Sequence, residues 1–149
     1  MVVVIGSLQC IAEEYLFRGI FMQTLGSWIK VPVIAVLLQA SVFAVQHKYD
    51  VYGLMSVLIS GVAFGAVAWI TRGLEAGCAM HIMNNVPVFY LVAAGLTGLS
   101  GSSNLITVIY TVCVDGAFVL VMWILRIKTH LFDEVKKNDL AIWNEKHSK

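Results

Sequence analysis

The sequence predicts an all-α protein, a polytopic transmembrane helical bundle of about five spans that ends in a short amphipathic tail. Apolar residues make up 59% of the 149 positions and charged residues 13%, about half the share of a soluble domain. The mean hydropathy is +0.83. The apolar runs are long and continuous and lack the period-two alternation of strands. This pattern favours helices, which satisfy their backbone hydrogen bonds internally in lipid.

The first two apolar segments cover residues 2–29 and 33–47. A membrane-spanning helix needs about 20 mostly apolar residues. The first segment has no basic region before it and runs past any plausible cleavage site, so we interpret it as a span rather than a signal peptide. The polar stretch His-Lys-Tyr-Asp ends the second segment.

The remaining segments cover residues 51–70, 74–96 and 105–127. The first of these contains Gly61 and Gly65, a small-residue spacing that lets helices approach closely. A Gly/Ser-rich loop before the last segment ends at Asn104, a candidate helix N-cap. No internal repeat or linker divides the chain. We therefore expect one transmembrane domain over residues 1–127 and a polar tail over residues 128–149.

Basic residues are distributed unequally between the two sides of the predicted bundle. The positive-inside rule then places the C-terminal tail in the cytoplasm. The tail forms either an amphipathic helix on the membrane surface or a solvated, partly disordered segment. We expect an integral protein in contact with membrane lipids, and the brevity of the chain favours a prokaryotic plasma membrane. One side receives Lys30, Arg72, Arg126, Lys128, Lys136 and Lys137, and the other receives Lys48.

Two function classes are disfavoured by composition. The net charge of +1 gives no electrostatic footprint for a nucleic acid, so no nucleic-acid partner is expected. Cys10, Cys78 and Cys113 lie singly in apolar runs. Their odd number and scattered positions argue against a disulfide framework or a structural zinc site.

Ionisable side chains inside the apolar segments are few, and at membrane depth such residues usually mark a site. Glu14 and Arg18 are four residues apart on one helix face and are expected to form an ion pair that neutralises both charges. Glu13 points about 100° away from Glu14 and is a candidate general base. The ionisable residues within the segments are Glu13, Glu14, Arg18, His47, His81 and Asp115.

Two further pairs of side chains share a helix face, Phe43 with His47 and His81 with Asn85. Hydrolysis of an amide by water needs a base, a group that orients the water and donors for the oxyanion. Glu13 is assigned as the base, His47 as the water-orienting or proton-carrying group, and His81 and Asn85 as the oxyanion donors. The structural alternatives are an interfacial His47 at a helix end and a hydrogen-bonded core His81.

The depth of the histidines in the bilayer raises a geometric question. At 1.5 Å per residue, a simple five-span arrangement places His47 near the outer end and His81 about 10 Å from the cytoplasmic end. The two rings could then meet only if the helices tilt strongly or if residues 72–77 interrupt the helix inside the membrane.

The stretches EEYLFR, FAVQH and HIMNN occur in this order on separate segments. They resemble the motifs EExxxR, FxxxH and HxxxN of the CAAX-processing and bacteriocin-processing (CPBP) family of intramembrane proteases, which includes the type II prenyl-protein endopeptidases. The resemblance covers about half of the chain. It implies CAAX-type or bacteriocin-related peptide-bond hydrolysis on a membrane-embedded or lipidated substrate. The implied catalytic residues are Glu13, His47, His81 and Asn85, supported by Glu14, Arg18 and Phe43.

The resemblance leaves the cofactor open, because the family is often named metalloprotease while a glutamate mechanism without metal is also proposed for it. The sequence has no HExxH zinc signature, so we favour a site without a cofactor. If zinc is bound, the candidate ligands are Glu13, His47 and His81. Two alternative functions are a non-catalytic bacteriocin self-immunity protein and a small proton-coupled transporter subunit. The three intact motifs favour the protease.

Overall fold

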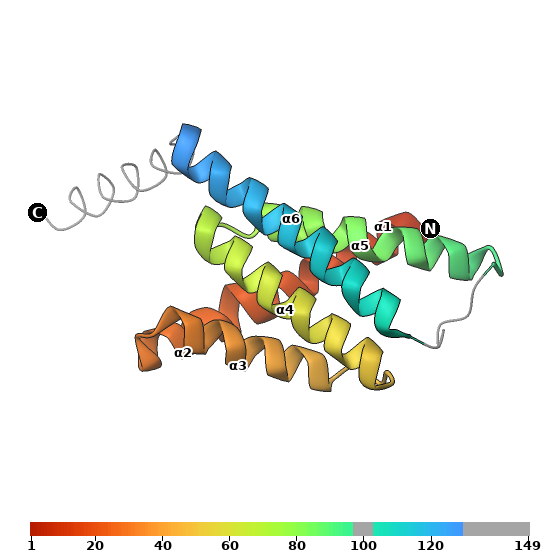
Figure 1. The fold of residues 1–149 in the computed structure, drawn as a ribbon, viewed down its shortest axis with the longest axis horizontal. Helices are drawn as coiled ribbons and strands as arrows, with labels where there is room; N and C mark the ends of the chain where they lie inside the picture. The colour runs from red at the N-terminus through yellow and green to blue at the C-terminus, as the bar shows by residue number, and fades with distance from the viewer. Residues whose placement is uncertain (97–102, 130–149) are drawn as a thin grey trace, which may run out of the picture.

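The computed structural model describes residues 1–96 and 103–129. The described residues form helices and no strand, which confirms the predicted all-α class. The helices cross one another obliquely, and α4 lies between α3 and α6 (Figure 1). The elements are α1 (Val2–Glu14), η1 (Tyr15–Phe21), α2 (Met22–Ile29), α3 (Pro32–Val45), α4 (Val51–Thr71), α5 (Glu75–Ala93) and α6 (Leu105–Thr129).

The first predicted segment is one continuous helical stretch with a change of helix type in its middle. The stretch η1 is π-helical and connects α1 to α2. Such wide turns are rare and are found mostly at functional sites. The stretch ends at Lys30, whose φ of 58° is left-handed, and Pro32 at the first turn of α3 then starts a new helix. The wide turn itself was not predicted from the sequence.

The remaining segments match helices whose ends are set by local hydrogen bonds. The Asp50 carboxylate accepts a hydrogen bond of 2.8 Å from the backbone N–H of Gly53 at the start of α4. Asn104 accepts one of 3.1 Å from the backbone N–H of Thr107, which confirms the predicted N-cap of α6. Arg72 ends α4 in the left-handed conformation, with φ of 57°.

Three helices in the described part of the chain, α4, α5 and α6, are long and apolar enough to cross a membrane. The α3 helix is apolar but shorter, at 14 residues. The five predicted helical segments are therefore present, although fewer than five meet the length of a complete span. Many large apolar side chains are exposed, as expected for a surface in contact with lipid, including Trp28, Leu37, Trp69 and Ile109. The predicted amphipathic helix in the tail lies outside the described residues.

The α3 and α4 helices approach closely at Gly61. A Cβ atom placed on Gly61 would lie 3.1 Å from the Cβ atom of Ala40. A Cβ atom on Gly65 would lie 2.7 Å from the amide nitrogen of Gln39. The predicted role of this glycine pair in helix packing is thus confirmed.

Replacing Gly61 with Val is expected to lower the free energy of unfolding by about 1–3 kcal/mol, because the added side chain must push α3 away from α4. Thermal unfolding in detergent measures the change. The matched control is Gly116→Val in α6, where a Cβ atom meets no neighbour within 4 Å. Equal unfolding temperatures for the two variants would contradict the packing role.

Candidate active site

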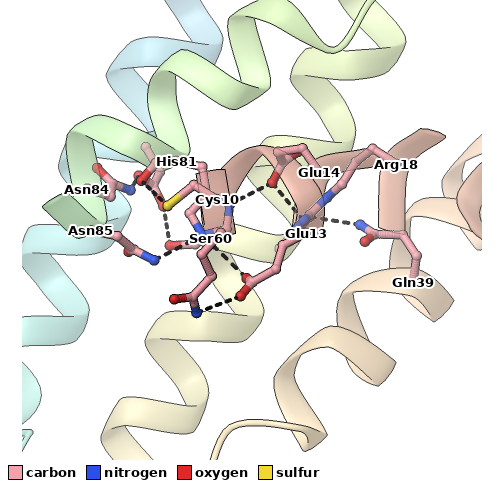
Figure 2. Close-up of polar contacts among 12 residues, drawn as sticks. Cys10, Glu13, Glu14, Arg18, Gln39, Ser60, His81, Asn84 and Asn85 are labelled. Atoms are coloured by element: carbon pink, nitrogen blue, oxygen red, sulfur yellow. Dashed lines mark hydrogen bonds and ion pairs between the residues drawn. The ribbon is translucent and has the colours of Figure 1, made fainter. Parts of the chain in front are cut away.

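Glu13, His81 and Asn85 gather with the Glu14–Arg18 pair where α1 and η1 contact α3, α4 and α5 (Figure 2). Polar side chains from these helices form a connected set inside an apolar bundle, and their hydrogen bonds run between helices far apart in the sequence. The set drawn in Figure 2 includes Cys10, Glu13, Glu14, Arg18, Gln39, Ser60, His81, Asn84 and Asn85.

Arg18 and Glu14 form the innermost part of the site. Both side chains are 0% exposed, and a nitrogen of Arg18 lies 2.8 Å from Oε1 of Glu14. A second Arg18 nitrogen donates to the carbonyl oxygen of Gly61 at 3.2 Å. The guanidinium also lies over the rings of Phe43 and Phe64, 4.5 and 5.1 Å from their centroids. Its buried charge is therefore compensated from several directions.

The carbonyl of Gly61 receives a further hydrogen bond, 2.8 Å long, from the amide of Gln39. Gly77 in α5 has a related role on the other side of Glu14, because a Cβ atom there would lie 3.1 Å from Oε2 of that residue. Gly77 thus lets α5 approach the ion pair. The position of Gln39 was not predicted, although an amide inside an apolar run is a signal for it.

His81 is held by two side chains. Its Nδ1 atom lies 2.9 Å from Oε1 of Glu14, and its Nε2 atom lies 3.0 Å from the amide nitrogen of Asn85. The hydrogen-bond network assigns the ring proton to Nδ1, because a carboxylate only accepts and the Asn85 amide donates to the Nε2 lone pair. Glu14 therefore contacts His81 as well as Arg18, a link that the sequence did not predict.

Glu13 faces the same histidine from the outer side of the cluster. Its Oε2 atom lies 3.7 Å from Nε2 of His81, and its side chain is 24% exposed. Its Oε1 atom accepts a hydrogen bond of 3.0 Å from Gln9, whereas Oε2 has no hydrogen-bond partner among the described residues. The Oε2 atom is also buried, so it is an unsatisfied acceptor that faces His81.

His47 lies just beyond the end of α3 and is tied to Phe43. Its Nδ1 atom donates to the Phe43 carbonyl at 2.8 Å, and its ring centroid lies 4.9 Å from that of Phe43. The Phe43 ring lies 6.0 Å from the His81 ring. The two histidines therefore approach a common aromatic ring. No hydrogen bond or ion pair joins His47 to Glu13, His81 or Asn85 within the described residues.

His47 and His81 both approach the Phe43 ring, although a simple five-span arrangement would place the two histidines far apart along the bundle. The fourth segment begins after the left-handed Arg72, and α5 starts at Glu75, so that His81 lies in its second turn. Figure 1 shows α4 crossing α1 and α5 obliquely. A parallel five-span arrangement, which would separate the rings, is not the one adopted.

The alternative zinc ligands do not form a metal site in the described part of the chain. No group of three or more His, Cys, Asp and Glu side chains there is arranged to hold a metal ion. Glu13 and His81 approach each other, whereas His47 is turned to the Phe43 carbonyl. The three candidate ligands are thus not gathered at one point in the described part of the chain, and no step is derived through a metal.

A bundle of apolar helices that gathers glutamate, histidine and asparagine side chains against one another has a polar site of the kind that marks a functional centre in membrane proteins. A family model described as type II CAAX prenyl endopeptidase Rce1-like matches residues 1–87, more than half of the chain. The chain belongs to this family. The predicted resemblance to the CPBP intramembrane proteases is thereby confirmed. No significant match was found among curated proteins or among solved structures. The match contains all three motifs, and α6 lies outside it.

Proposed function

We propose that the chain is an intramembrane endopeptidase that hydrolyses a peptide bond at the prenylated CAAX end of a protein substrate. CAAX denotes a C-terminal cysteine that carries the prenyl group and the three residues that follow it. The observation that carries the proposal is the unpaired Oε2 atom of Glu13 beside Nε2 of His81. The family match favours this function over a non-catalytic immunity protein and a transporter subunit.

In the proposed reaction, the unpaired Oε2 atom of Glu13 takes a proton from a water molecule that enters beside it. The water oxygen bonds to the carbonyl carbon of the substrate, and the carbonyl oxygen becomes an oxyanion. An N–H of Asn85 that is not bonded to His81 stabilises this charge. The carbon–nitrogen bond then breaks, and the proton held by Glu13 passes to the leaving amine. Water is consumed, and a carboxylic acid and an amine are formed, which at neutral pH are a carboxylate and an ammonium ion.

The histidines have supporting parts in this proposal. His81 carries its proton on Nδ1 and accepts at Nε2 from Asn85, so it holds that amide in place. The oxyanion-donor role predicted for His81 would need a second ring proton, which the proposed reaction does not supply. His47 keeps a free Nε2 lone pair because Nδ1 donates to Phe43. This atom is available to orient the attacking water, as the sequence predicts.

The function is tested with the purified full chain in detergent and a prenylated CAAX peptide. Mass spectrometry of the products in ¹⁸O-labelled water identifies the bond that is hydrolysed, since one labelled oxygen enters the new carboxylate. The matched peptide without the prenyl group reports whether the lipid is required. A folded chain that leaves both peptides intact would refute the proposal.

The proposed reaction uses no metal, so activity is expected to persist after treatment with a strong chelator. Elemental analysis of the purified protein is expected to give much less than one zinc per chain. Activity that is lost on chelation and restored by added Zn²⁺ would overturn this mechanism in favour of the zinc alternative.

We also propose the orientation given by the basic residues, with the C-terminal tail in the cytoplasm of a prokaryotic cell. A reporter protein fused after Lys149 measures this directly. Reporter activity found only outside the cytoplasm would reverse the orientation.

A further inference from the structure

A second buried polar cluster lies beside the candidate active site and has no part in the proposed reaction. Asp115 in α6 is 1% exposed. Its carboxylate accepts hydrogen bonds from Ser60 of α4, at 2.6 Å, and from Asn84 of α5, at 3.0 Å. Figure 2 shows Ser60 and Asn84 next to Asn85 of the active site. Asp115 lies outside the residues matched to the family, so the family match assigns it no role.

A cavity of about 360 Å³ between α4, α5 and α6 joins the two clusters. His81 and Asn85 contribute to its wall, and so does Asp115 with its two partners. Its volume lies within the range of about 300–1,000 Å³ that is typical of ligand sites. A ligand in this cavity would contact the proposed oxyanion donor and the Asp115 cluster at once.

The chemistry of the wall distinguishes a peptide from a hydrocarbon chain. Each oxygen of a carboxylate can accept two hydrogen bonds, and each oxygen of Asp115 accepts one from the protein. The side chains of Tyr110 and Thr111, which carry hydroxyl groups, also contribute to the wall. A hydrocarbon chain would leave these groups unmatched, whereas the N–H and C=O groups of a peptide require such partners away from water.

A second cavity provides the contrast. It lies between α3 and α4, also measures about 360 Å³, and is lined only by apolar side chains. Two spaces of equal size thus differ in the kind of ligand that they suit. The apolar lining consists of Pro32, Val33, Val36, Leu37, Val62, Ala66 and Trp69.

We infer that the cavity between α4, α5 and α6 binds the main chain of the substrate peptide next to the cleaved bond, and that Asp115 and the hydroxyl groups beside it hydrogen-bond to that chain. The inference rests on the proposed endopeptidase function. It places the peptide part of the substrate, rather than its lipid, against α6.

Crosslinking tests this placement without turnover. The full chain carrying Glu13→Gln is mixed with a prenylated CAAX peptide that has a benzophenone side chain at the residue after the cysteine. Irradiation followed by mass spectrometry is expected to place the crosslinks on α5 and α6, within residues 83–88 and 107–115, which contribute to the cavity wall. Crosslinks confined to the apolar cavity between α3 and α4 would overturn the inference.

A matched pair of α6 variants tests the cavity independently. Val114 lines the cavity, whereas Val112, two residues away and 50% exposed, does not. In the Glu13→Gln chain, Val114→Trp is expected to weaken peptide binding at least tenfold, and Val112→Trp to leave it unchanged. Asp115→Asn, which keeps the shape of the side chain but removes an acceptor, is expected to weaken binding about tenfold. Equal effects of the two tryptophans would overturn the inference, provided that both variants melt like the parent.

The results separate this inference from the proposed function. Crosslinks on α5 and α6 in the Glu13→Gln chain, combined with no hydrolysis by the unsubstituted chain, would refute the endopeptidase and support the binding site. Hydrolysis of the prenylated peptide, combined with crosslinks elsewhere, would support the endopeptidase and refute the binding site.

Discussion

Replacing Glu13 with Gln is expected to lower turnover of a prenylated CAAX peptide by about 10²–10⁴, the usual contribution of a general base. An amide cannot take a proton from water, while its oxygen can still accept the hydrogen bond from Gln9. The variant should therefore fold and melt like the parent chain. Activity is measured as product formed per folded protein, with the melting temperature as the control. Turnover within a factor of ten of the parent would assign the base to another residue, with His81 the first candidate.

A second substitution sharpens this test. Removing an oxyanion donor costs about 10²–10³ in turnover, so Asn85→Ala is expected to be slow but folded. If Glu13 and Asn85 act on the same water and carbonyl, the double variant should be little worse than Glu13→Gln alone. If the double variant loses turnover by the product of the two single losses, Glu13 and Asn85 act independently of each other.

Replacing Arg18 with Ala is expected to lower the free energy of unfolding by about 3–5 kcal/mol, because the charge of Glu14 stays buried without its partner. The loss includes the contacts of the guanidinium with the Gly61 carbonyl and the Phe43 ring. Chemical or thermal unfolding in detergent measures the effect. Arg18→Lys is expected to recover part of it, since an ammonium restores the charge but not the planar contacts.

The control for Arg18 removes both charges. Arg18→Met combined with Glu14→Gln should unfold at a higher temperature than Arg18→Ala, because no unpaired charge is then buried. If Arg18→Ala instead melts like the parent and is inactive, the structural role is wrong and Arg18 belongs to the chemistry.

Local patterns in the sequence predicted most of the fold. Long apolar runs and their polar ends placed the helical segments, and the cap at Asn104 followed from residue type alone. The π-helical η1 was missed because neither propensity nor periodicity distinguishes it from an ordinary helix. The short α3 was predicted as a full span because apolar composition indicates that a helix lies in lipid but does not indicate where the helix ends.

The candidate site was predicted as a set of residues but not as an arrangement. Spacing within one helix predicted that Glu14 and Arg18 pair, and the distance of 2.8 Å agrees. Contacts between helices depend on crossing angles and rotation, which spacing within one helix does not contain. The bond between Glu14 and His81 and the attachment of His47 to Phe43 therefore emerged only from the structure. The roles given to Glu13, His47, His81 and Asn85 stay predictions.

The wide turn η1 also sets how far α2 is rotated about the helix axis relative to α1. An i→i+5 hydrogen bond spans one residue more than the i→i+4 bond of an α-helix, so α2 is rotated relative to a straight continuation of α1. The two halves can therefore be oriented separately, α1 toward α5 and α2 toward α3. Conversion of this turn to an ordinary α-helix, with every residue kept, would turn one half by about 100° relative to the other. The carboxylates and the α3 contact would then no longer face their partners together, even with every motif residue intact.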